Sequence, residues 1–318
     1  MITTEQMDAL VASKYALLAS NEIFKNNEAD VKEGLREEIN SLTELALPDV
    51  CRKRCDFFKL SGTRPEDYRE RIIEVPGKGF LLAGIRFRGL DVTKPFVSVI
   101  PSFITTENDL TLIKELIKEE FRVFRPQAFQ LTLSPKYLRE RVDILEDRFT
   151  VAGKIDSILR EKLCTEVKIE LVATSEIDFY ERYVQEYLVF HEQRPELKLE
   201  VRSESLDDLN ESLKSNLLYK IMINDEFAGV IAGAISNYHG ISGASVLEEL
   251  LFSTFRGKKL GVHVQYEFAK KLKGRFEVLW GTISPKNQSS LKTALKNQRK
   301  ITETDYFIST DERGFYEQ

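Results

Sequence analysis

Apolar residues recur at helical spacing over most of residues 3–60 and then give way to shorter, strand-like runs. Side chains three or four positions apart share one face of a helix, so this spacing indicates amphipathic helices. The positions concerned are Leu10, Tyr15, Leu18, Ile23, Phe24, Val31, Leu35, Ile39, Leu42 and Leu45. Pro48 interrupts the pattern, which resumes over residues 50–58 and ends at a turn over 61–65.

The region after this turn alternates between strand and helix patterns. Apolar runs predict strands at residues 71–75, 80–87, 95–103 and 128–133. Thr106 can cap a helix that continues to Phe121, between the third and fourth of these strands. The pattern over residues 136–163 predicts mostly helix.

The second half of the chain repeats this order of elements. Strands are predicted at residues 167–173, 218–224, 226–234, 245–252, 276–283 and 305–308. Helices are predicted at residues 176–192, 204–214, 262–272 and 287–298. Asn224-Asp225 is a typical hairpin turn between the second and third strands. Because the halves share no detectable sequence identity, the order of elements alone predicts two modules of similar architecture.

The segment Arg256-Gly-Lys-Lys-Leu-Gly261 joins the predicted strand 245–252 to the helix after it. A turn rich in glycine and cations presents main-chain N–H groups at the positive end of a helix, which suits a diphosphate. The next strand ends at Ser284-Pro285, and another helix opens at Asn287 with polar side chains. These side chains can reach a ligand that lies across both turns.

These residues resemble the acyl-CoA elements of the Gcn5-related N-acetyltransferase (GNAT) superfamily. The family signature is Arg or Gln, two residues, Gly, one residue, then Gly or Ala, which is similar to the segment from Arg256 to Gly261. The second family element, a strand followed by Asn-x-x-Ser or Asn-x-x-Ala, is similar to Asn287–Ser290. The resemblance covers residues 166–310.

The resemblance implies an α/β (α+β) fold of two GNAT-like modules, each a mixed, mostly antiparallel sheet flanked by helices. The expected domains are a helical segment with a degenerate GNAT-like module at 1–150, a helical linker at 151–165, and an acyl-CoA-binding catalytic domain at 166–318. The N-terminal module is expected to bind no cofactor, because its strand-to-helix joint at 98–107 contains no Arg or Gly.

The resemblance also implies acetyl-CoA as co-substrate, held where the strands 245–252 and 276–283 separate. Pantetheine is expected to bond with the backbone of the first strand, and the diphosphate with the N–H groups of the turn. The expected cofactor-binding residues are Leu251, Phe252, Ser253, Arg256, Gly257, Lys258, Lys259, Leu260, Gly261, Asn287 and Ser290.

Two positions depart from the family pattern. Lys259 stands where the family has its middle glycine, so its side chain must point away from the phosphates or bind them. Ala294 stands where the family has a tyrosine that protonates the leaving thiolate, and Gln298-Arg299 replaces a Gly-Phe ending. Ser290, Tyr306 or water remain as sources of that proton.

Transfer of an acetyl group to an amine needs a base, because only the neutral amine attacks the thioester. Glu248 and Glu249 lie on the strand beside the expected thioester. Strand alternation sends one to each face of the sheet, so one of the two is the expected catalytic base. The sequence leaves open which one.

Composition narrows the class of protein. The 318 residues carry a net charge of −5 with a pI near 5.6, which argues against nucleic-acid and anionic-membrane partners. No apolar run is long enough to span a bilayer and no signal peptide is evident, so a cytoplasmic protein is expected. Three cysteines (Cys51, Cys55 and Cys164) and three histidines form no metal-ligand spacing, so no metal is expected.

The function expected from this resemblance is acetyl transfer to a primary amine of a small-molecule or amino-acid-like acceptor. A non-catalytic acyl-CoA-binding or protein-interaction module is an alternative, favoured by Lys259 and Ala294. A protein or peptide N-acetyltransferase is a further alternative. Tandem GNAT-like peptidyltransferases that use charged tRNA are disfavoured by the phosphate turn and the lack of a basic face.

Overall fold

The computed structural model describes residues 2–133, 143–160 and 167–311. The chain forms two compact units. Unit 1 combines residues 1–148 with 303–318, and unit 2 contains residues 149–302. These boundaries differ from the expected domains, because the end of the chain belongs to the unit that its beginning forms.

Unit 1 begins with three helices, as the apolar spacing predicts. These are α1 (Thr4–Leu18), α2 (Glu28–Thr43) and α3 (Pro48–Phe58). The Thr3 hydroxyl accepts the Gln6 N–H while the Gln6 side chain accepts the Thr3 N–H, which satisfies the first turn of α1. Pro48 is the first residue of α3, where its missing N–H removes no hydrogen bond.

The sheet of unit 1 has the order β1-β2-β3-β4-β11. Its strands are β1 (Arg71–Val75), β2 (Gly79–Phe87), β3 (Pro95–Pro101), β4 (Ala128–Thr132) and the end of β11 (Lys300–Ser309). β3 and β4 run parallel, and the other neighbours are antiparallel. The crossover between β3 and β4 contains α4 (Leu110–Glu120), since parallel neighbours need a long connection.

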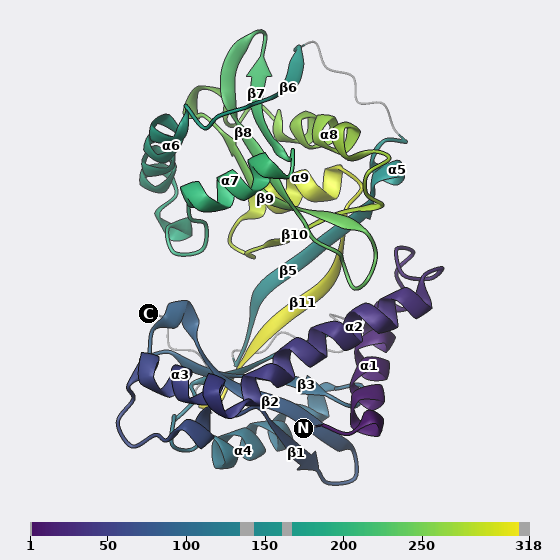
Figure 1. The fold of residues 1–318 in the computed structure, drawn as a ribbon, viewed down its shortest axis with the longest axis vertical. Coiled ribbons are helices and arrows are strands. Elements are labelled where there is room, and N and C mark those ends of the chain that lie inside the picture. The colour runs from purple at the N-terminus through teal and green to yellow at the C-terminus, as the bar shows by residue number, and fades with distance from the viewer. Residues whose placement is uncertain (1, 134–142, 161–166, 312–318) are drawn as a thin grey trace. The chain divides into compact units, whose positions relative to one another are not determined.

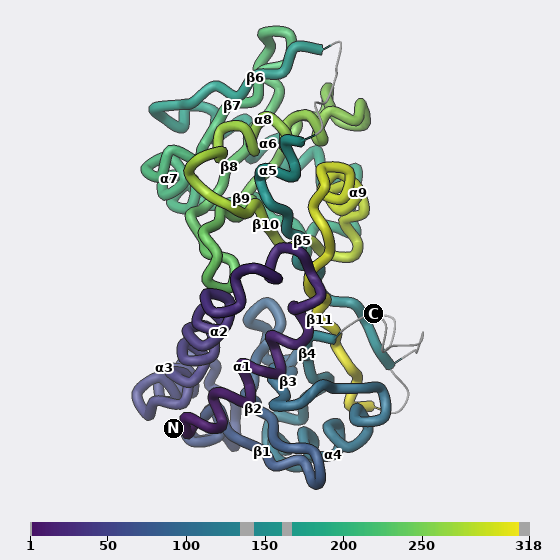
Figure 2. Tube along the Cα trace, turned by 90° about the vertical axis from the view of Figure 1, so that its right-hand side faces the viewer, coloured from purple at the N-terminus to yellow at the C-terminus, as the bar shows by residue number. Residues whose placement is uncertain are grey.

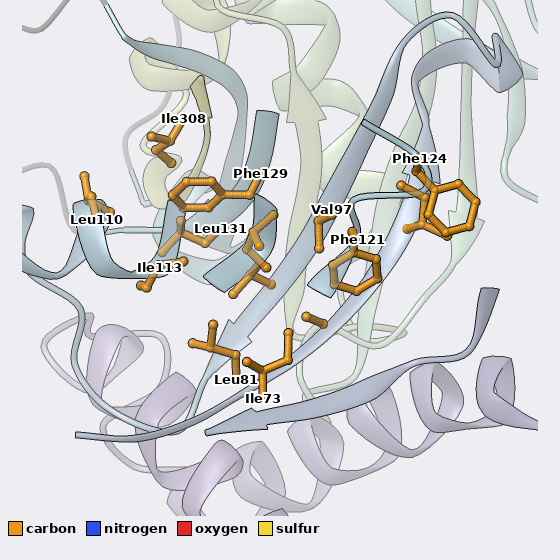
Figure 3. Packing of buried hydrophobic residues seen from close by; sticks show 14 of the residues in the cluster. Ile73, Leu81, Val97, Leu110, Ile113, Phe121, Phe124, Phe129, Leu131 and Ile308 are labelled. Carbon is orange, nitrogen blue, oxygen red and sulfur yellow. The ribbon is translucent and has the colours of Figure 1, made fainter. Parts of the chain in front are cut away.

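The C-terminal strand contributes directly to the core of unit 1. Ile308 of β11 lies beside Leu110 of α4 and Phe129 of β4 (Figure 3), and all three side chains are buried. Burying one such side chain contributes roughly 1.5–3 kcal/mol. Strand β11 therefore stabilises the unit formed mainly by the first half of the sequence.

Unit 2 contains a sheet of the order β6-β7-β8-β9-β10-β5. Its strands are β6 (Ile169–Ala173), β7 (Leu218–Ile223), β8 (Glu226–Ile235), β9 (Gly243–Leu251), β10 (Val278–Ile283) and the end of β5 (Ile144–Lys154). β9 and β10 run parallel, and the other neighbouring strands among the described residues are antiparallel. Its helices are α5 (Ile155–Ile158), α6 (Tyr180–Gln193), α7 (Leu206–Lys214), α8 (Gly261–Leu272) and α9 (Gln288–Lys296) (Figure 1).

Two separate apolar clusters cover the two faces of this sheet. Residues of α6 and α7 pack with Val230, Leu250 and Phe252 on one face. Residues of α8 pack with Ile231 and Leu279 on the other. Val230 and Ile231 are neighbours in β8, so the strand alternation that the sequence predicts decides which helix each side chain meets.

The two sheets repeat one pattern of strand order and direction. β1-β2-β3-β4-β11 in unit 1 matches β7-β8-β9-β10-β5 in unit 2, with the parallel pair at the same place. The repeat that the order of elements predicts is confirmed. Each sheet is completed by a strand from the other half of the sequence, and the two crossings of the chain can be followed along β5 and β11 (Figure 2).

The expected helix over residues 136–163 is wrong for most of its described part. Residues 144–154 form β5, which pairs with β10 from Phe149–Ile283 to Lys154–Val278. Residues 151–154 are therefore strand, α5 covers only Ile155–Ile158, and 161–166 lie outside the described residues. Val151 is buried within this strand, and the antiparallel partner that holds it there is remote in sequence.

Candidate functional site

Strands β9 and β10 separate after a short parallel contact. They pair at Gly243–Val278, Ala244–Leu279 and Ser245–Trp280. Beyond this point β9 continues along β8 to Leu251, while β10 continues along β5 to Ile283. The facing edges thus present main-chain groups that the sheet does not pair, at the position expected for the cofactor.

The edge of β9 that faces β10 is formed by alternate residues. The Phe252 N–H donates to the Ala228 carbonyl at 2.8 Å, which makes this a hydrogen-bonded pair of the β8–β9 ladder. Since such pairs alternate in an antiparallel ladder, the main-chain groups of Glu249 and Leu251 turn away from β8. A pantetheine amide can pair with these two residues as an added strand would.

Phe252 and Ser253 were expected to contact the cofactor, but the protein itself uses their main-chain N–H groups. The N–H of Phe252 is used by β8, and the N–H of Ser253 donates to Glu186 Oε2 at 2.7 Å. The Phe252 side chain is fully buried and packs 4.9 Å from Phe227, centroid to centroid. The structure therefore places the main chain of Glu249 and the N–H of Leu251, rather than Phe252 and Ser253, at the open edge, since the Leu251 carbonyl accepts Arg256 Nε.

The turn between β9 and α8 has two residues in the left-handed region. Gly257 has φ +75° and Lys259 has φ +61°. A non-glycine residue in this region is strained by about 1–2 kcal/mol, which explains why glycine is the family residue at the position of Lys259. Lys259 keeps the left-handed backbone that glycine would adopt, and its side chain is exposed.

Helix α8 begins at Gly261 without a side-chain cap. The first intrahelical bonds run from the His263 and Val264 N–H groups to the Leu260 carbonyl, so the N–H groups before them are open to an anion. Exposed Lys258 and Lys259 lie in the turn just before this end, so charge there favours a diphosphate.

Gly261 is required for packing. A Cβ at this position would lie 3.0 Å from Glu249 Oε1 and 3.3 Å from Thr293 Cγ2. Because glycine has no side chain, α8 can approach β9 and α9 closely. A larger residue at Gly261 would disturb Glu249 as well as any bound diphosphate.

Arg256 is held by the protein itself. Its Nε donates to the Leu251 carbonyl at 2.7 Å, and its Nη2 donates to the Glu186 carbonyl and carboxylate at 2.9 and 3.0 Å. Its guanidinium carbon also lies 5.4 Å from the centre of the Phe190 ring. The side chain thus fixes the start of the turn.

Asn287 and Ser290 form the cap of α9. The Asn287 side chain accepts the Ser290 N–H at 3.3 Å. This arrangement satisfies one of the otherwise open donors of the first helical turn. The cap fixes the start of α9 after β10, and the half-buried Ser290 hydroxyl remains as a polar group there.

Glu248 is a buried carboxylate held by two tyrosines of α6. Its side chain is 5% exposed and accepts hydrogen bonds from the Tyr183 hydroxyl and, at 2.8 Å, from the Tyr187 hydroxyl. Burial raises the pKa of Glu248 to about 7, against the lowering effect of the two hydroxyls. Burial and the Glu248 charge raise the pKa of both tyrosines, so they remain protonated.

Glu249 points to the opposite face, as the alternation predicts. Its carboxylate accepts a hydrogen bond from Gln265 of α8, and Gln265 Oε1 accepts one from Arg299 Nη2 at 2.6 Å. Burial lowers the pKa of Arg299 to about 10, yet the guanidinium stays charged at neutral pH. Gln265 therefore bridges a carboxylate and a cation beneath α8.

Three residues of α6 that contact the candidate site were not predicted from the sequence: Tyr183, Glu186 and Tyr187. They lie at positions i, i+3 and i+4 of α6, so they project from one face of the helix. The spacing is visible in the sequence, but aromatic residues at this spacing are usually core. Their contacts with Glu248 and Arg256 are separated by more than 60 residues, which no local pattern reveals.

Ala294 places no hydroxyl at the position of the family tyrosine. Ala294 is fully buried in a small cluster with Phe149, Val151 and Leu291. Tyr306 is buried in the core of unit 1. Its use as an acid in unit 2 has no support from its surroundings.

Within the described ranges, no group of three His, Cys, Asp or Glu residues could hold a metal ion. No helix among these residues is long and apolar enough to cross a membrane. Cys51 and Cys55 are free thiols on α3, and Cys164 lies outside the described residues.

Comparisons with known proteins find likeness among solved structures. Neither a family model nor a curated protein matches the sequence. A GNAT-family acetyltransferase from Colwellia psychrerythraea is 7% identical with a TM-score of 0.47, over 82% of this chain and 96% of the other. A GCN5-related N-acetyltransferase from Sphaerobacter thermophilus is 11% identical with a TM-score of 0.45, over 86% and 92%.

A tandem GNAT protein from the clavulanic acid biosynthesis pathway is 11% identical with a TM-score of 0.39, over 83% of this chain and 95% of the other. At these values the likeness carries no conclusion about activity. The mixed, mostly antiparallel sheets, the separation of β9 from β10 and the turn before α8 are those that the sequence resemblance implied. The chain therefore folds as two GNAT-like units in tandem.

Proposed function

We propose that unit 2 transfers an acetyl group from acetyl-CoA to a primary amine of a small-molecule or amino-acid-like acceptor. The observation that carries this proposal is the separation of β9 from β10 beside the uncapped start of α8. The two features together supply a main-chain edge for amides and an anion site for a diphosphate. A pantetheine diphosphate contains both groups in this order.

The cofactor contacts follow from the open groups of the site. The main chain of Glu249 and the N–H of Leu251 would pair with the pantetheine amides. The N–H groups of residues 259–262 would bind the diphosphate, with Lys258 and Lys259 adding charge. Arg256, Asn287 and Ser290 would support the turn and the start of α9 through the bonds described above.

Glu248 is the proposed base. The substrate ammonium first loses a proton towards the carboxylate. The neutral amine nitrogen then attacks the thioester carbonyl carbon, the C–S bond breaks, and the nitrogen loses its second proton to water. Because Glu248 is buried, a tyrosine hydroxyl would take the first proton as it gives its own to Glu248. A base with a pKa near 7 is well matched to this task at neutral pH. Water would protonate the departing thiolate.

The proposal is tested by measuring CoA release from acetyl-CoA across a panel of primary amines, beside acetyl-CoA binding by calorimetry. Thiol release that depends on an amine, together with binding of one acetyl-CoA per chain, would support it. Peptides with free amines belong in the panel, since acetylation of peptides alone would shift the acceptor class. A folded chain that binds no acetyl-CoA would refute the proposal.

A second candidate is an acyl-CoA-binding module without turnover. Ala294 in an apolar cluster supports it, because the usual acid is absent. The nearly complete burial of Glu248 also supports it, since a carboxylate held by two tyrosines can serve packing alone. Tight binding with no thiol release for any amine would select this candidate.

A further inference from the structure

Helix α6 contacts both parts of the proposed site. Tyr183 and Tyr187 hold the carboxylate of Glu248, and Glu186 lies between them in sequence. Glu186 bonds instead with the segment that follows β9. One face of one helix thus contacts the proposed base and the proposed phosphate turn.

The carboxylate of Glu186 gathers several donors of this segment. Oε2 accepts the Ser253 N–H at 2.7 Å and Arg256 Nη2 at 3.0 Å, and Oε1 accepts the Ser253 hydroxyl at 3.3 Å. The Glu186 main-chain carbonyl accepts Arg256 Nη2 as well, at 2.9 Å. The side chains of Glu186 and Arg256 are 15% and 19% exposed, so the pair is weakly screened by water.

These bonds determine what Arg256 can do. Its guanidinium joins the last residue of β9 to α6, through the Leu251 carbonyl and Glu186. Its charge is balanced by a carboxylate that the protein provides, so it contributes little net attraction for a diphosphate. Its planar group can satisfy several acceptors at once, which the single ammonium of lysine does less well.

We propose that Glu186 is a positioning residue for the acyl-CoA turn, and that it acts through Arg256 and the Ser253 N–H. The inference rests on the proposed function, because it assigns a role at the same site. Without Glu186, the N–H of Ser253 and the guanidinium lose their anchor. The residues after them, from Gly257 to Gly261, would then sample conformations that do not bind a diphosphate.

The test uses the full chain and coenzyme A, with affinity measured by calorimetry. Glu186→Ala and Arg256→Ala should each weaken binding about tenfold, as the loss of a charge-assisted hydrogen bond implies. The double variant should be no weaker than the weaker single variant, because both changes remove the same link. Glu192→Ala, an exposed change on α6, should leave the affinity unchanged.

Glu186→Gln tests how much of the effect on affinity comes from hydrogen bonding and how much from the negative charge. It keeps an oxygen for the Ser253 N–H but loses the ion pair with Arg256, so its affinity should lie between wild type and Glu186→Ala. It also carries the test if Glu186→Ala does not fold. At saturating acetyl-CoA, both Glu186 variants should retain kcat within about threefold while KM for acetyl-CoA rises, as expected when cofactor binding is affected more than chemistry.

The outcomes distinguish the two proposals. A wild-type chain that binds no coenzyme A refutes both. Wild-type binding with unchanged affinity in folded Glu186→Ala and Glu186→Gln variants refutes only the role of Glu186. Additive losses in the double variant would also refute it, because Glu186 would then act by a route that does not include Arg256.

Discussion

The parallel strand pairs of the two units open in the same way but lead to different helix starts. In unit 1, β3 and β4 pair from Phe96–Ala128 to Ser98–Gln130 and then separate, as β9 and β10 do in unit 2. The main-chain layout is thus shared. What differs is whether the helix after the first of these strands begins with an open or an occupied N-terminus.

The helix start of unit 1 carries its own anion. Asp109 accepts the Thr106 N–H and hydroxyl, each at 2.8 Å, and its carboxylate lies 3.0 Å from Lys78 Nζ. Burial opposes ionisation, but these bonds lower the pKa of Asp109 below its usual range. A fixed carboxylate there repels a second anion and occupies the Thr106 N–H and hydroxyl.

The start of α8 in unit 2 has no side-chain cap, and the nearby Glu249 carboxylate is held by the Gln265 side chain. Leu260 occupies the cap position, and the preceding Lys258 and Lys259 add positive charge. On the proposed function, separated strands alone do not make a diphosphate site. The helix N-terminus must also remain open, and this depends on a few residues at the joint.

The largest expected effect is on Glu248. Glu248→Gln should lower kcat by about 10²–10⁴, the usual contribution of general-base catalysis. In the wild type, activity should rise with pH through about 7, because the base must be deprotonated, and the variant should lose this acid limb. Steady-state rates from pH 5 to pH 9 measure both.

Glu249→Gln provides the comparison on the same strand. Since Glu249 points to Gln265 on the other face, this variant should keep the pH profile of the wild type. Glu226→Gln, at an exposed position of β8, serves as the surface control. Wild-type turnover in both the Glu248 and Glu249 variants would place the base elsewhere.

The Glu248 carboxylate also has a predicted effect on the free energy of unfolding. The pKa of Glu248 is raised from 4.5 to about 7 in the folded chain, so folding favours its protonated form. The contribution of Glu248 to the free energy of unfolding is most favourable below pH 4.5. As the pH rises through 7, this contribution falls by up to about 3 kcal/mol. Glu248→Gln should therefore increase the unfolding free energy more at pH 8 than at pH 5.

Denaturant unfolding of the wild type and of Glu248→Gln at the two pH values checks this prediction. The two tyrosines can still bond with the Gln side chain oxygen, so burial is retained without charge. An equal difference between the proteins at both pH values would mean that Glu248 is not protonated more readily in the folded state. Asp109, whose pKa is lowered, should behave in the opposite sense if replaced by Asn.

Charge reversal tests the open helix start. Lys258→Glu should weaken acetyl-CoA binding by about tenfold at low salt, because it places a carboxylate near the proposed diphosphate site. The loss should shrink at high salt, since Lys258 is exposed. Lys53→Glu makes the same charge change at an exposed site in unit 1 and should have no effect.

The number of acetyl-CoA molecules bound per chain compares the two units directly. Calorimetry should find one acetyl-CoA per chain, bound by unit 2, because Asp109 occupies the joint of unit 1. Asp109→Asn should leave this number at one, since an amide oxygen still accepts the Thr106 N–H. Two sites in the wild type would contradict the difference drawn between the units.

Much of this fold could be predicted from local patterns. The strands β7, β8 and β9 and the hairpin at Asn224-Asp225 lie where the sequence indicates, because alternation and turn chemistry are local. Local patterns could not predict that β5 completes the sheet of unit 2 and that β11 completes the sheet of unit 1. Phe149 and Ile308 gain their burial from strands remote in sequence, and short apolar runs do not specify such partners.

The geometry of the candidate site was predictable to a similar extent. The motif located the turn, and alternation placed Glu248 and Glu249 on opposite faces. The motif suggested that Arg256 binds phosphate, but the structure shows that Glu186 and Leu251 hold its guanidinium. A side chain's partner depends on tertiary packing, so residue type and spacing alone could not identify it.

The smallest expected effect concerns Lys259. Its φ of +61° suits glycine, so Lys259→Gly should relieve strain of about 1–2 kcal/mol, partly offset by the greater freedom of glycine in the unfolded chain. A net gain of a few tenths to about 1 kcal/mol in unfolding free energy is expected.

Lys259→Ala removes the same ammonium but keeps the strained backbone. If Lys259 adds charge to the diphosphate site, both variants should lose acetyl-CoA affinity equally, while only the glycine variant gains stability. If the glycine variant binds acetyl-CoA more tightly than wild type, the lysine side chain obstructs the turn, and the departure from the family glycine weakens cofactor binding in this chain.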